Sequence, residues 1–257
     1  MIEHVAEKIK DADLVLVGLG EELDAFAAFR DEPKYQSILK KLENSWMLPF
    51  IYNMKMEEII KEQKELYKLL ASCLYKKNYF IVSVCMDGAI REAGLDEGRI
   101  VEPCGGYRKL QCSGKCNTEL YEIPVELQQQ INKFYENELC DDEPEEPVCP
   151  ICGSSLVFNN VNALNYVEEG YLEQWSIYKK WLQGTVNKKI CILEVGVGMK
   201  YPTVIRWPFE KITFYNNKAE LFRVHSRLYQ ISEEIKGKGY GICKSPEEFI
   251  KELSNIF

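Results

Sequence analysis

Four cysteines have the spacing of a metal site. Cys112 and Cys116 are separated by three residues and Cys149 and Cys152 by two, with about 30 residues between the pairs. Four thiolates suit a tetrahedral zinc ion, and a small module with little core gains much of its folding free energy from such a site. Four protein ligands leave no position open, so we expect a structural zinc. Four free or disulfide-bonded thiols are the alternative.

Another cysteine, Cys104, precedes two glycines in the stretch RIVEPCGGYRKLQCSGKC, residues 99–116. Three interpretations of this thiol are open: a small buried hydrophobe, a nucleophile, or a redox-sensitive group. Gly105 and Gly106 predict a tight turn or a close backbone approach. Cys140 is a spare thiol near the four-cysteine pattern.

Alternating strands and helices must position these cysteines. Short apolar runs predict strands at 13–18, 79–84, 189–198, 211–216 and 221–225. Residues 21–29 are compatible with a helix. The longest helical pattern, at 56–77, has one apolar face made of Ile59, Ile60, Leu66, Leu69, Leu70 and Cys73. Continuous apolar strands alternating with helices predict an α/β fold, a doubly wound Rossmann-like parallel sheet with a small zinc-ribbon or helical module.

The composition changes along the chain and suggests two units. Cysteine, proline and charge rise between about 106 and 156, where the apolar periodicity falls. We expect residues 1–105 and 157–257 to form the Rossmann-like domain, with a helical insertion at about 35–77. Residues 106–156 are expected to form the zinc-binding module.

Glycines lie where predicted strands end. Gly18 and Gly20 follow the first run, and Gly196 and Gly198 close a later one. Ligands of doubly wound sheets bind outside the carboxyl ends of the strands, so these glycines are candidate ligand-binding residues. Glu21 and Glu22 follow directly; their carboxylates either compete with a bound anion or only stabilise the start of a helix.

Composition excludes some classes of partner. The 257 residues carry a formal net charge of -8, with 40 acidic against 32 basic side chains and no basic block. This charge argues against nucleic acid as a partner. No apolar run is long enough to span a membrane, and the first 20 residues lack a secretory pattern. We therefore expect a cytoplasmic protein with reduced cysteines and no membrane partner.

The order of these motifs resembles the sirtuins, NAD-dependent deacylases and ADP-ribosyltransferases. A glycine-rich strand-turn-helix, a strand leading to an aspartate, a four-cysteine insertion and a Gly-x-Gly strand end follow one another over almost the whole chain. The segment LEVGVGMKYPTVIRWPFEKITFYNNKA, residues 193–219, is most similar to the macrodomain-linked sirtuins of microbes. The resemblance implies NAD as cofactor beside the structural zinc.

The resemblance also implies cofactor-binding positions. The family's Gly-Ala-Gly-x-Ser loop, which wraps the NAD phosphate, corresponds to residues 18–22. The family's later Asp-Phe-Arg motif is partly matched by Phe29-Arg30. The nicotinamide-pocket motif Thr-Gln-Asn-x-Asp corresponds to residues 83–87, where Cys85 replaces the asparagine and Asp87 keeps the aspartate. Asp87 is either a pocket residue or an N-cap for the segment GAIREAG.

The resemblance assigns two further functional positions of the family to this sequence. The catalytic His-Gly of the family, Gln-Gly in the macrodomain-linked group, corresponds to Cys104-Gly105, which makes Cys104 the residue at the base position. The late asparagine that meets the adenosine ribose corresponds to His225; the alternative is an edge or surface histidine. Arg206 either forms an internal salt bridge or faces an acidic ligand, and Trp207-Pro208-Phe209 is expected in the core.

These substitutions change the expected chemistry. An ordinary thiol has a pKa of about 8.5 and cannot replace an imidazole base near neutral pH, which argues against lysine deacylation. ADP-ribosyl transfer or NAD cleavage needs mainly substrate distortion and charge stabilisation, and is the favoured activity.

Two function hypotheses follow. One is an enzyme that binds NAD or ADP-ribose and modifies a protein substrate, which the resemblance suggests carries a lipoyl group. The alternative is a pseudoenzyme, a sirtuin-fold scaffold that binds a nucleotide fragment or a protein partner without turnover.

Overall fold

Six parallel strands form the central sheet of the structure, a computed structural model that describes residues 1–26, 36, 40–43, 45–137 and 143–257. Their order across the sheet is β3 (Ile100–Val101), β2 (Tyr79–Ser83), β1 (Leu14–Leu19), β6 (Ile190–Val195), β7 (Ala219–His225) and β8 (Gly239–Cys243). The predicted doubly wound parallel sheet is confirmed.

The two central strands are buried along their whole length. β1 pairs with β6 in parallel register from Leu14 opposite Ile190 to Leu19 opposite Val195. A parallel strand covered on both faces needs no polar side, which explains why both read as continuous apolar runs in the sequence.

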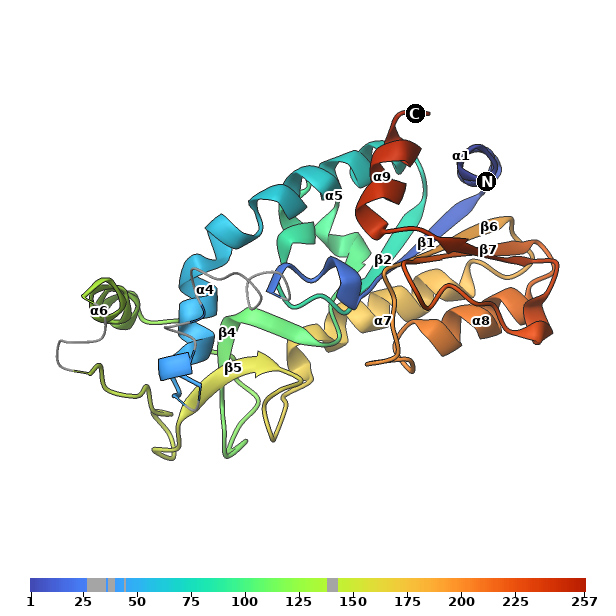
Figure 1. Ribbon diagram of the computed structural model, residues 1–257. Coiled ribbons are helices and arrows are strands. Elements are labelled where there is room, and N and C mark those ends of the chain that lie inside the picture. The colour runs from blue at the N-terminus through green and yellow to red at the C-terminus, as the bar shows by residue number, and fades with distance from the viewer. Residues whose placement is uncertain (27–35, 37–39, 44, 138–142) are drawn as a thin grey trace.

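Helices cover both faces of this sheet (Figure 1). One face carries α1 (Ile2–Asp11), α5 (Lys61–Cys73) and α9 (Pro246–Ser254), and the other carries α7 (Glu169–Gln183) and α8 (Arg206–Tyr215). α9 begins at a regular cap, because the Ser245 hydroxyl accepts a hydrogen bond from the Glu248 N–H and Pro246 occupies the first turn. No helix among the described residues is long and apolar enough to cross a membrane.

The long helical pattern at 56–77 is divided between two helices. α4 (Leu48–Ile59) and α5 meet at Ile60, and α5 packs against α9. Leu66, Leu70 and Cys73 are buried as predicted, but Leu69 is exposed, so the predicted apolar face was too wide.

One predicted strand was wrong. Residues 211–216 lie in and directly after α8, whose Thr213 hydroxyl donates a hydrogen bond to the Phe209 carbonyl one turn earlier. Phe209 and Thr213 are both buried, so tertiary packing on one helical face outweighs the β propensity of the segment. Trp207 was also misplaced: its side chain is 48% exposed, whereas Phe209 is in the core.

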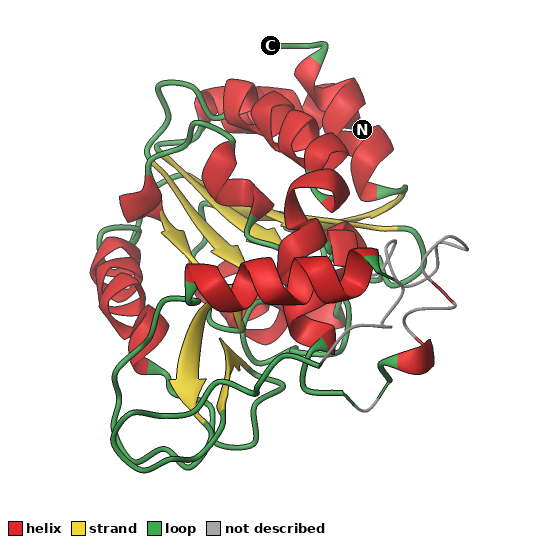
Figure 2. Ribbon diagram, turned by 90° about the vertical axis from the view of Figure 1, so that its left-hand side faces the viewer, coloured by secondary structure: helices red, strands yellow, loops and turns green. Residues whose placement is uncertain are grey.

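A second, two-stranded sheet lies apart from the first (Figure 2). β4 (Gly105–Cys112) pairs antiparallel with β5 (Leu156–Asn160), and α4 packs against both β4 and α6 (Val125–Glu136). The described part of the chain also contains four short 3-10 helices: η1 (Glu21–Leu23), η2 (Ala89–Glu92), η3 (Glu97–Arg99) and η4 (Glu233–Ile235).

Some sequence predictions fall on segments that the structure does not cover. The helix expected over 21–29 begins with η1 instead of an α-helical turn, and its remainder beyond residue 26 lies outside the described residues. Phe29-Arg30 and Cys140 lie outside them as well.

Candidate active-site crevice and cysteine cluster

The strand order places a topological switch point, a candidate ligand crevice, between the ends of β1 and β6. The chain leaves β1 toward β2 on one side of the sheet and leaves β6 toward β7 on the other. Loops that diverge in this way open a ligand-binding crevice outside the carboxyl ends of the two strands. The Gly20 N–H donates to the Val195 carbonyl at 2.9 Å, which holds the two loops together at the base of the crevice.

Gly20 must be a glycine because the two loops touch there. A Cβ atom on Gly20 would lie 2.2 Å from the Val197 Cα. Gly18 has a different role, since a Cβ atom there would collide with Ile205 and Phe209 beside β1. Gly18 therefore packs against the α8 side of the sheet, and Gly20 lines the crevice.

Gly196 and Gly198 form the opposite wall. Gly196 has a φ of 68°, in the left-handed region that favours glycine, and a Cβ atom on it would lie 3.0 Å from both Glu22 Cβ and Pro246 Cγ. A Cβ atom on Gly198 would lie 3.2 Å from Glu21 Oε2. Backbone groups therefore form this wall: the Gly196 carbonyl accepts a hydrogen bond from the Glu22 N–H, and the Gly198 N–H faces the first loop.

Glu21 reaches across the crevice to this wall. Its Oε2 accepts a hydrogen bond from the Gly198 N–H at 2.7 Å, and its Oε1 accepts one from the Lys200 N–H at 3.1 Å. The sequence left open whether this carboxylate meets the crevice or only stabilises a helix start. The structure directs it into the crevice.

Glu22 makes the equivalent contact with the end of β7. Its carboxylate accepts hydrogen bonds from the Ser226 N–H, at 3.1 Å, and from the Ser226 hydroxyl. Glu21 therefore binds backbone donors in the loop after β6, and Glu22 binds a backbone donor directly after β7.

His225 is buried at the end of β7. Its Nδ1 accepts hydrogen bonds from the N–H groups of Arg227 and Leu228, both at 3.1 Å, and burial lowers the pKa of the ring. Glu22 Oε2 lies 3.1 Å from the same nitrogen, and its charge raises the pKa of the ring against the larger effect of burial. The interpretation of His225 as a surface residue was wrong.

Asp87 joins the loops that follow β1 and β2. Its buried carboxylate accepts hydrogen bonds from the Ala25 N–H at 2.8 Å and from the Ala89 N–H at 2.9 Å. Burial, followed by the charge of Asp24, raises the pKa of Asp87 to about 7. Asp87 therefore binds the first N–H group of η2 and fixes the first loop, and its expected place in a ligand pocket stays a prediction.

Cys85 supports the floor of the crevice. Its thiol donates to the Gly20 carbonyl at 3.2 Å, and the buried Tyr67 hydroxyl lies 3.8 Å from the sulfur. Burial raises the pKa of Cys85 well above its usual value. Cys85 therefore holds the loop after β1 in place as a neutral thiol.

Cys104 is buried beside the turn into β4. Burial, followed by the charge of Glu21, raises the pKa of the Cys104 thiol to about 12, so the thiol is protonated at neutral pH. A protonated, buried thiol is neither a general base nor a good nucleophile. The geometry fits the small-hydrophobe interpretation. Gly105, with a φ of 67°, allows the close approach, because a Cβ atom there would lie 2.2 Å from the Asn159 carbonyl oxygen.

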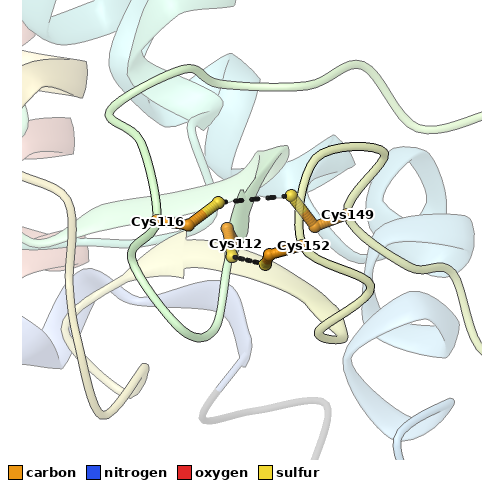
Figure 3. Close-up of side chains that lie close together, drawn as sticks. All are labelled: Cys112, Cys116, Cys149 and Cys152. Atoms are coloured by element: carbon orange, nitrogen blue, oxygen red, sulfur yellow. Dashed lines mark hydrogen bonds between the residues drawn. The ribbon is translucent and has the colours of Figure 1, made fainter.

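The four predicted metal ligands converge in the second sheet region (Figure 3). Their sulfur atoms all lie within 4.8 Å of one another, with 3.4 Å between Cys112 and Cys152 and 3.6 Å between Cys116 and Cys149. Zinc–sulfur bonds of about 2.3 Å in a tetrahedron place the sulfurs roughly 3.8 Å apart. The cluster therefore fits a structural zinc.

The four thiols differ in their pKa values: the hydrogen bond with Cys152 raises the pKa of Cys116 to about 12, whereas the pKa values of Cys149 and Cys152 are lowered. The Ser154 hydroxyl lowers the pKa of Cys152 to about 6, and the Cys152 N–H lowers that of Cys149. The thiolate is the form that binds zinc.

Comparison with known proteins extends these observations. No family model matches the chain. Over 256 residues it is 21% identical to the protein ADP-ribosyltransferase of Staphylococcus aureus (strain Mu50), a match that covers 91% of this chain and 81% of the relative. A probable bifunctional ADP-ribose hydrolase/ADP-ribosyltransferase of Fusarium oxysporum f. sp. cubense is 26% identical over 167 residues. That match covers 62% of this chain and 28% of the relative.

Solved structures of sirtuins superpose on the whole chain. A sirtuin studied for the structural basis of substrate affinity has a TM-score of 0.58 and 14% identity, covering 100% of this chain and 99% of its own. A Sir2 homologue mutant in complex with ADP-ribose has the same TM-score and identity and covers 99% and 96%. The chain has the sirtuin fold. The predicted resemblance is confirmed.

The sirtuin fold gathers most of the predicted site residues around one crevice. Gly20, Gly196 and Gly198 line it, Asp87 fixes its first loop, and His225 ends the neighbouring strand. Their roles toward a cofactor stay predictions. The four cysteines form a separate cluster at β4 and β5.

Sequence reasoning missed a buried ion pair beneath this crevice. Arg223 donates to Glu194 at 2.5 and 3.2 Å, and the two residues lie opposite each other in the register of β6 and β7. Both side chains are at most 1% exposed. An acidic residue within the apolar strand β6 and an arginine within the neighbouring strand β7 are a signal that could have predicted the pair.

Arg206 holds the loops beside this pair. Its guanidinium donates to the Val197 carbonyl at 2.9 Å and to the Leu228 carbonyl at 2.8 Å. These bonds tie the loop after β6 to the loop after β7. No ion pair of Arg206 with an acidic side chain occurs within 4 Å among the described residues, and the expectation that it faces an acidic ligand stays a prediction.

Proposed function

We propose that this sirtuin-fold protein binds NAD or ADP-ribose in the β1/β6 crevice and transfers ADP-ribosyl groups or cleaves NAD. One observation carries the proposal: the N–H groups of Gly198, Lys200 and Ser226 converge on the anionic first loop at the topological switch point. Such groups are the standard donors for a diphosphate. The two curated relatives, both described as ADP-ribosyltransferases, support the same activity.

Each crevice residue has a proposed part in binding. The backbone of Gly20, Gly196 and Gly198 gives the diphosphate close access, and Asp87 with Cys85 keeps the first loop in place. His225 lies at the ribose side, as the resemblance to the family implies. Bound NAD would supply the ADP-ribosyl group, with nicotinamide as the leaving group.

Transfer is favoured over lysine deacylation because the base position holds no base. Cys104 is buried and protonated at neutral pH, and its thiol offers no acceptor like the imidazole nitrogen. Scission of the nicotinamide bond depends more on distortion and on stabilisation of positive charge at the ribose.

Calorimetric titration of the zinc-loaded protein with NAD and with ADP-ribose tests the proposal. A Kd of about 1 μM, equivalent to about -8 kcal/mol, is the expected result for one of the two ligands. The Gly198→Glu variant should lose this binding, since its new side chain starts 3.2 Å from Glu21 Oε2. Absence of heat up to millimolar ligand in the wild-type protein contradicts the proposal.

A non-catalytic scaffold is the second candidate, and the buried Cys104 favours it. Release of nicotinamide from NAD, followed by chromatography, separates the candidates. Turnover identifies an enzyme, whereas binding of ADP-ribose without nicotinamide release identifies a scaffold.

The protein substrate and the compartment are further parts of the proposal. A lipoyl-carrying protein is the expected acceptor, and transfer of labelled ADP-ribose to a lipoylated domain but not to its unlipoylated form would support it. A cytoplasmic location stays a prediction from the reduced thiols.

A further inference from the structure

The donors at the crevice already have anionic partners from the chain itself. The N–H groups of Gly198 and Lys200 donate to Glu21, while the N–H and hydroxyl of Ser226 donate to Glu22. The acceptors are adjacent in the sequence, and the donors lie 177 to 204 positions away. One short turn, η1, therefore supplies carboxylates to two loops at the switch point.

The geometry of these contacts is that of a bound anion. A carboxylate oxygen 2.7 Å from an N–H nitrogen is at the distance of a charge-assisted hydrogen bond, the type that phosphate oxygens also make. Gly20, Gly196 and Gly198 add no side chains where the two loops approach each other, whereas the carboxylates already in place oppose a second anion.

We propose that Glu21 and Glu22 are built-in competitors of the diphosphate, and so determine the affinity of the crevice for it. A nucleoside diphosphate binds only when these two side chains rotate and their carboxylates leave the backbone donors. This inference rests on the proposed function, because it concerns the same crevice and the same class of ligand.

The backbone of η1 is anchored to the opposite loop, so only its glutamate side chains are free to move. The Glu22 N–H donates to the Gly196 carbonyl at 3.1 Å, and the Gly20 N–H donates to the Val195 carbonyl at 2.9 Å. Two contacts from elsewhere hold the end of η1, the Gln63 amide on the Leu23 carbonyl and Asp87 on the Ala25 N–H. The glutamate side chains can therefore rotate away while these contacts keep the backbone in place.

Calorimetry with inorganic pyrophosphate and with ADP-ribose tests the inference on the full zinc-loaded chain. The variants are Glu21→Ala, Glu21→Gln and Glu22→Ala. Loss of a carboxylate frees donors whose charge-assisted bonds correspond to about ten- to hundredfold in affinity, so Glu21→Ala should bind both probes at least tenfold more tightly than wild type. Glu21→Gln keeps the acceptor but not the charge and should show a smaller gain.

Glu247→Ala is the matched control. Glu247 is exposed in the first turn of α9, next to Pro246, which approaches Gly196, so this variant removes one negative charge near the crevice without freeing a donor. Its Kd for pyrophosphate should stay within twofold of wild type. An equal gain in Glu247→Ala would attribute the effect to net charge and overturn the inference.

The two probes separate this inference from the proposed function. Tighter pyrophosphate binding by Glu21→Ala, with no ADP-ribose binding by any variant, supports the competing glutamates and contradicts the NAD proposal. Micromolar ADP-ribose binding by wild type, with no gain in either Glu21 variant, overturns the inference and leaves the NAD proposal in place. Pyrophosphate binding that is unchanged in both Glu21→Ala and Glu21→Gln also overturns the inference. Two variants are used because one of them could be misfolded.

Discussion

The cysteine cluster and the β1/β6 crevice are built in different ways. The cluster takes its ligands from two short motifs in neighbouring loops, and each ligand contributes one sulfur atom. The crevice depends on loops that follow β1, β2, β6 and β7, and its groups contact one another through backbone N–H and carbonyl atoms. A site made of local motifs can be read from spacing, whereas a site made of backbone donors cannot.

This comparison predicts that the cluster is a separable stabilising unit and that the crevice is coupled to the sheet.

Removal of zinc should have the largest effect and should be confined to the second sheet. Binding of structural zinc to four thiolates is worth about 10–16 kcal/mol, so a chelator or the Cys149→Ser variant should expose residues 106–156 to protease while the central sheet resists. Metal analysis should find about one zinc per chain in the wild type.

Cys243→Ser is the control for this experiment. Cys243 is an exposed thiol outside the cluster, and its replacement should leave the zinc content unchanged. If the central sheet is digested at the same rate as the small one, the two regions are not separable.

The buried ion pair should show how strongly the crevice depends on the sheet. Arg223→Met leaves the Glu194 carboxylate buried without its main partner and should lower the free energy of unfolding by about 3–5 kcal/mol, measured in urea. The double variant Glu194→Leu, Arg223→Met should recover most of this loss. A single variant as stable as the double one would contradict the role of the pair.

Asp87 predicts a pH dependence of stability. Its pKa is raised from 3.8 to about 7 in the folded protein, so the folded state holds a proton that the unfolded state has lost between these values. The stabilisation from this group is complete below about pH 4 and is lost as pH rises through 7, by up to about 4 kcal/mol.

Asp87→Asn should remove this contribution to the pH dependence of the free energy of unfolding, measured by urea unfolding from pH 4 to pH 8. Asparagine retains one acceptor for the two N–H donors, which gives the variant a lower stability at pH 4. A wild-type slope that persists in Asp87→Asn would assign the titration to another group.

Replacement of Cys104 should have the smallest effect on stability and no effect on the rate of any reaction. Cys104→Ala deletes one buried sulfur atom and should cost about 1 kcal/mol of stability. Any release of nicotinamide should stay within twofold of wild type, because the thiol is protonated at neutral pH. Loss of turnover without loss of stability would restore a catalytic role for Cys104.

The sequence predicted the central strands because burial leaves a local trace. β1, β2, β6 and β7 coincide with apolar runs, since parallel strands covered on both faces admit few polar residues. Residues 211–216 were misread because their β-branched and aromatic side chains also fit one buried face of α8. β8 and α9 were not predicted, because the short partly polar strand GYGIC carries a weak pattern.

By itself the sequence determined the doubly wound class, the four-cysteine cluster and the glycines that end the strands. These features depend on residue type and on spacing over short distances, so they can be predicted from the sequence alone. Only the tertiary structure decided where the carboxylates of Glu21 and Glu22 point and whether Cys104 is ionised. The reason is physical: hydrogen-bond partners about 200 positions away and the degree of burial arise only when the sheet brings distant loops together.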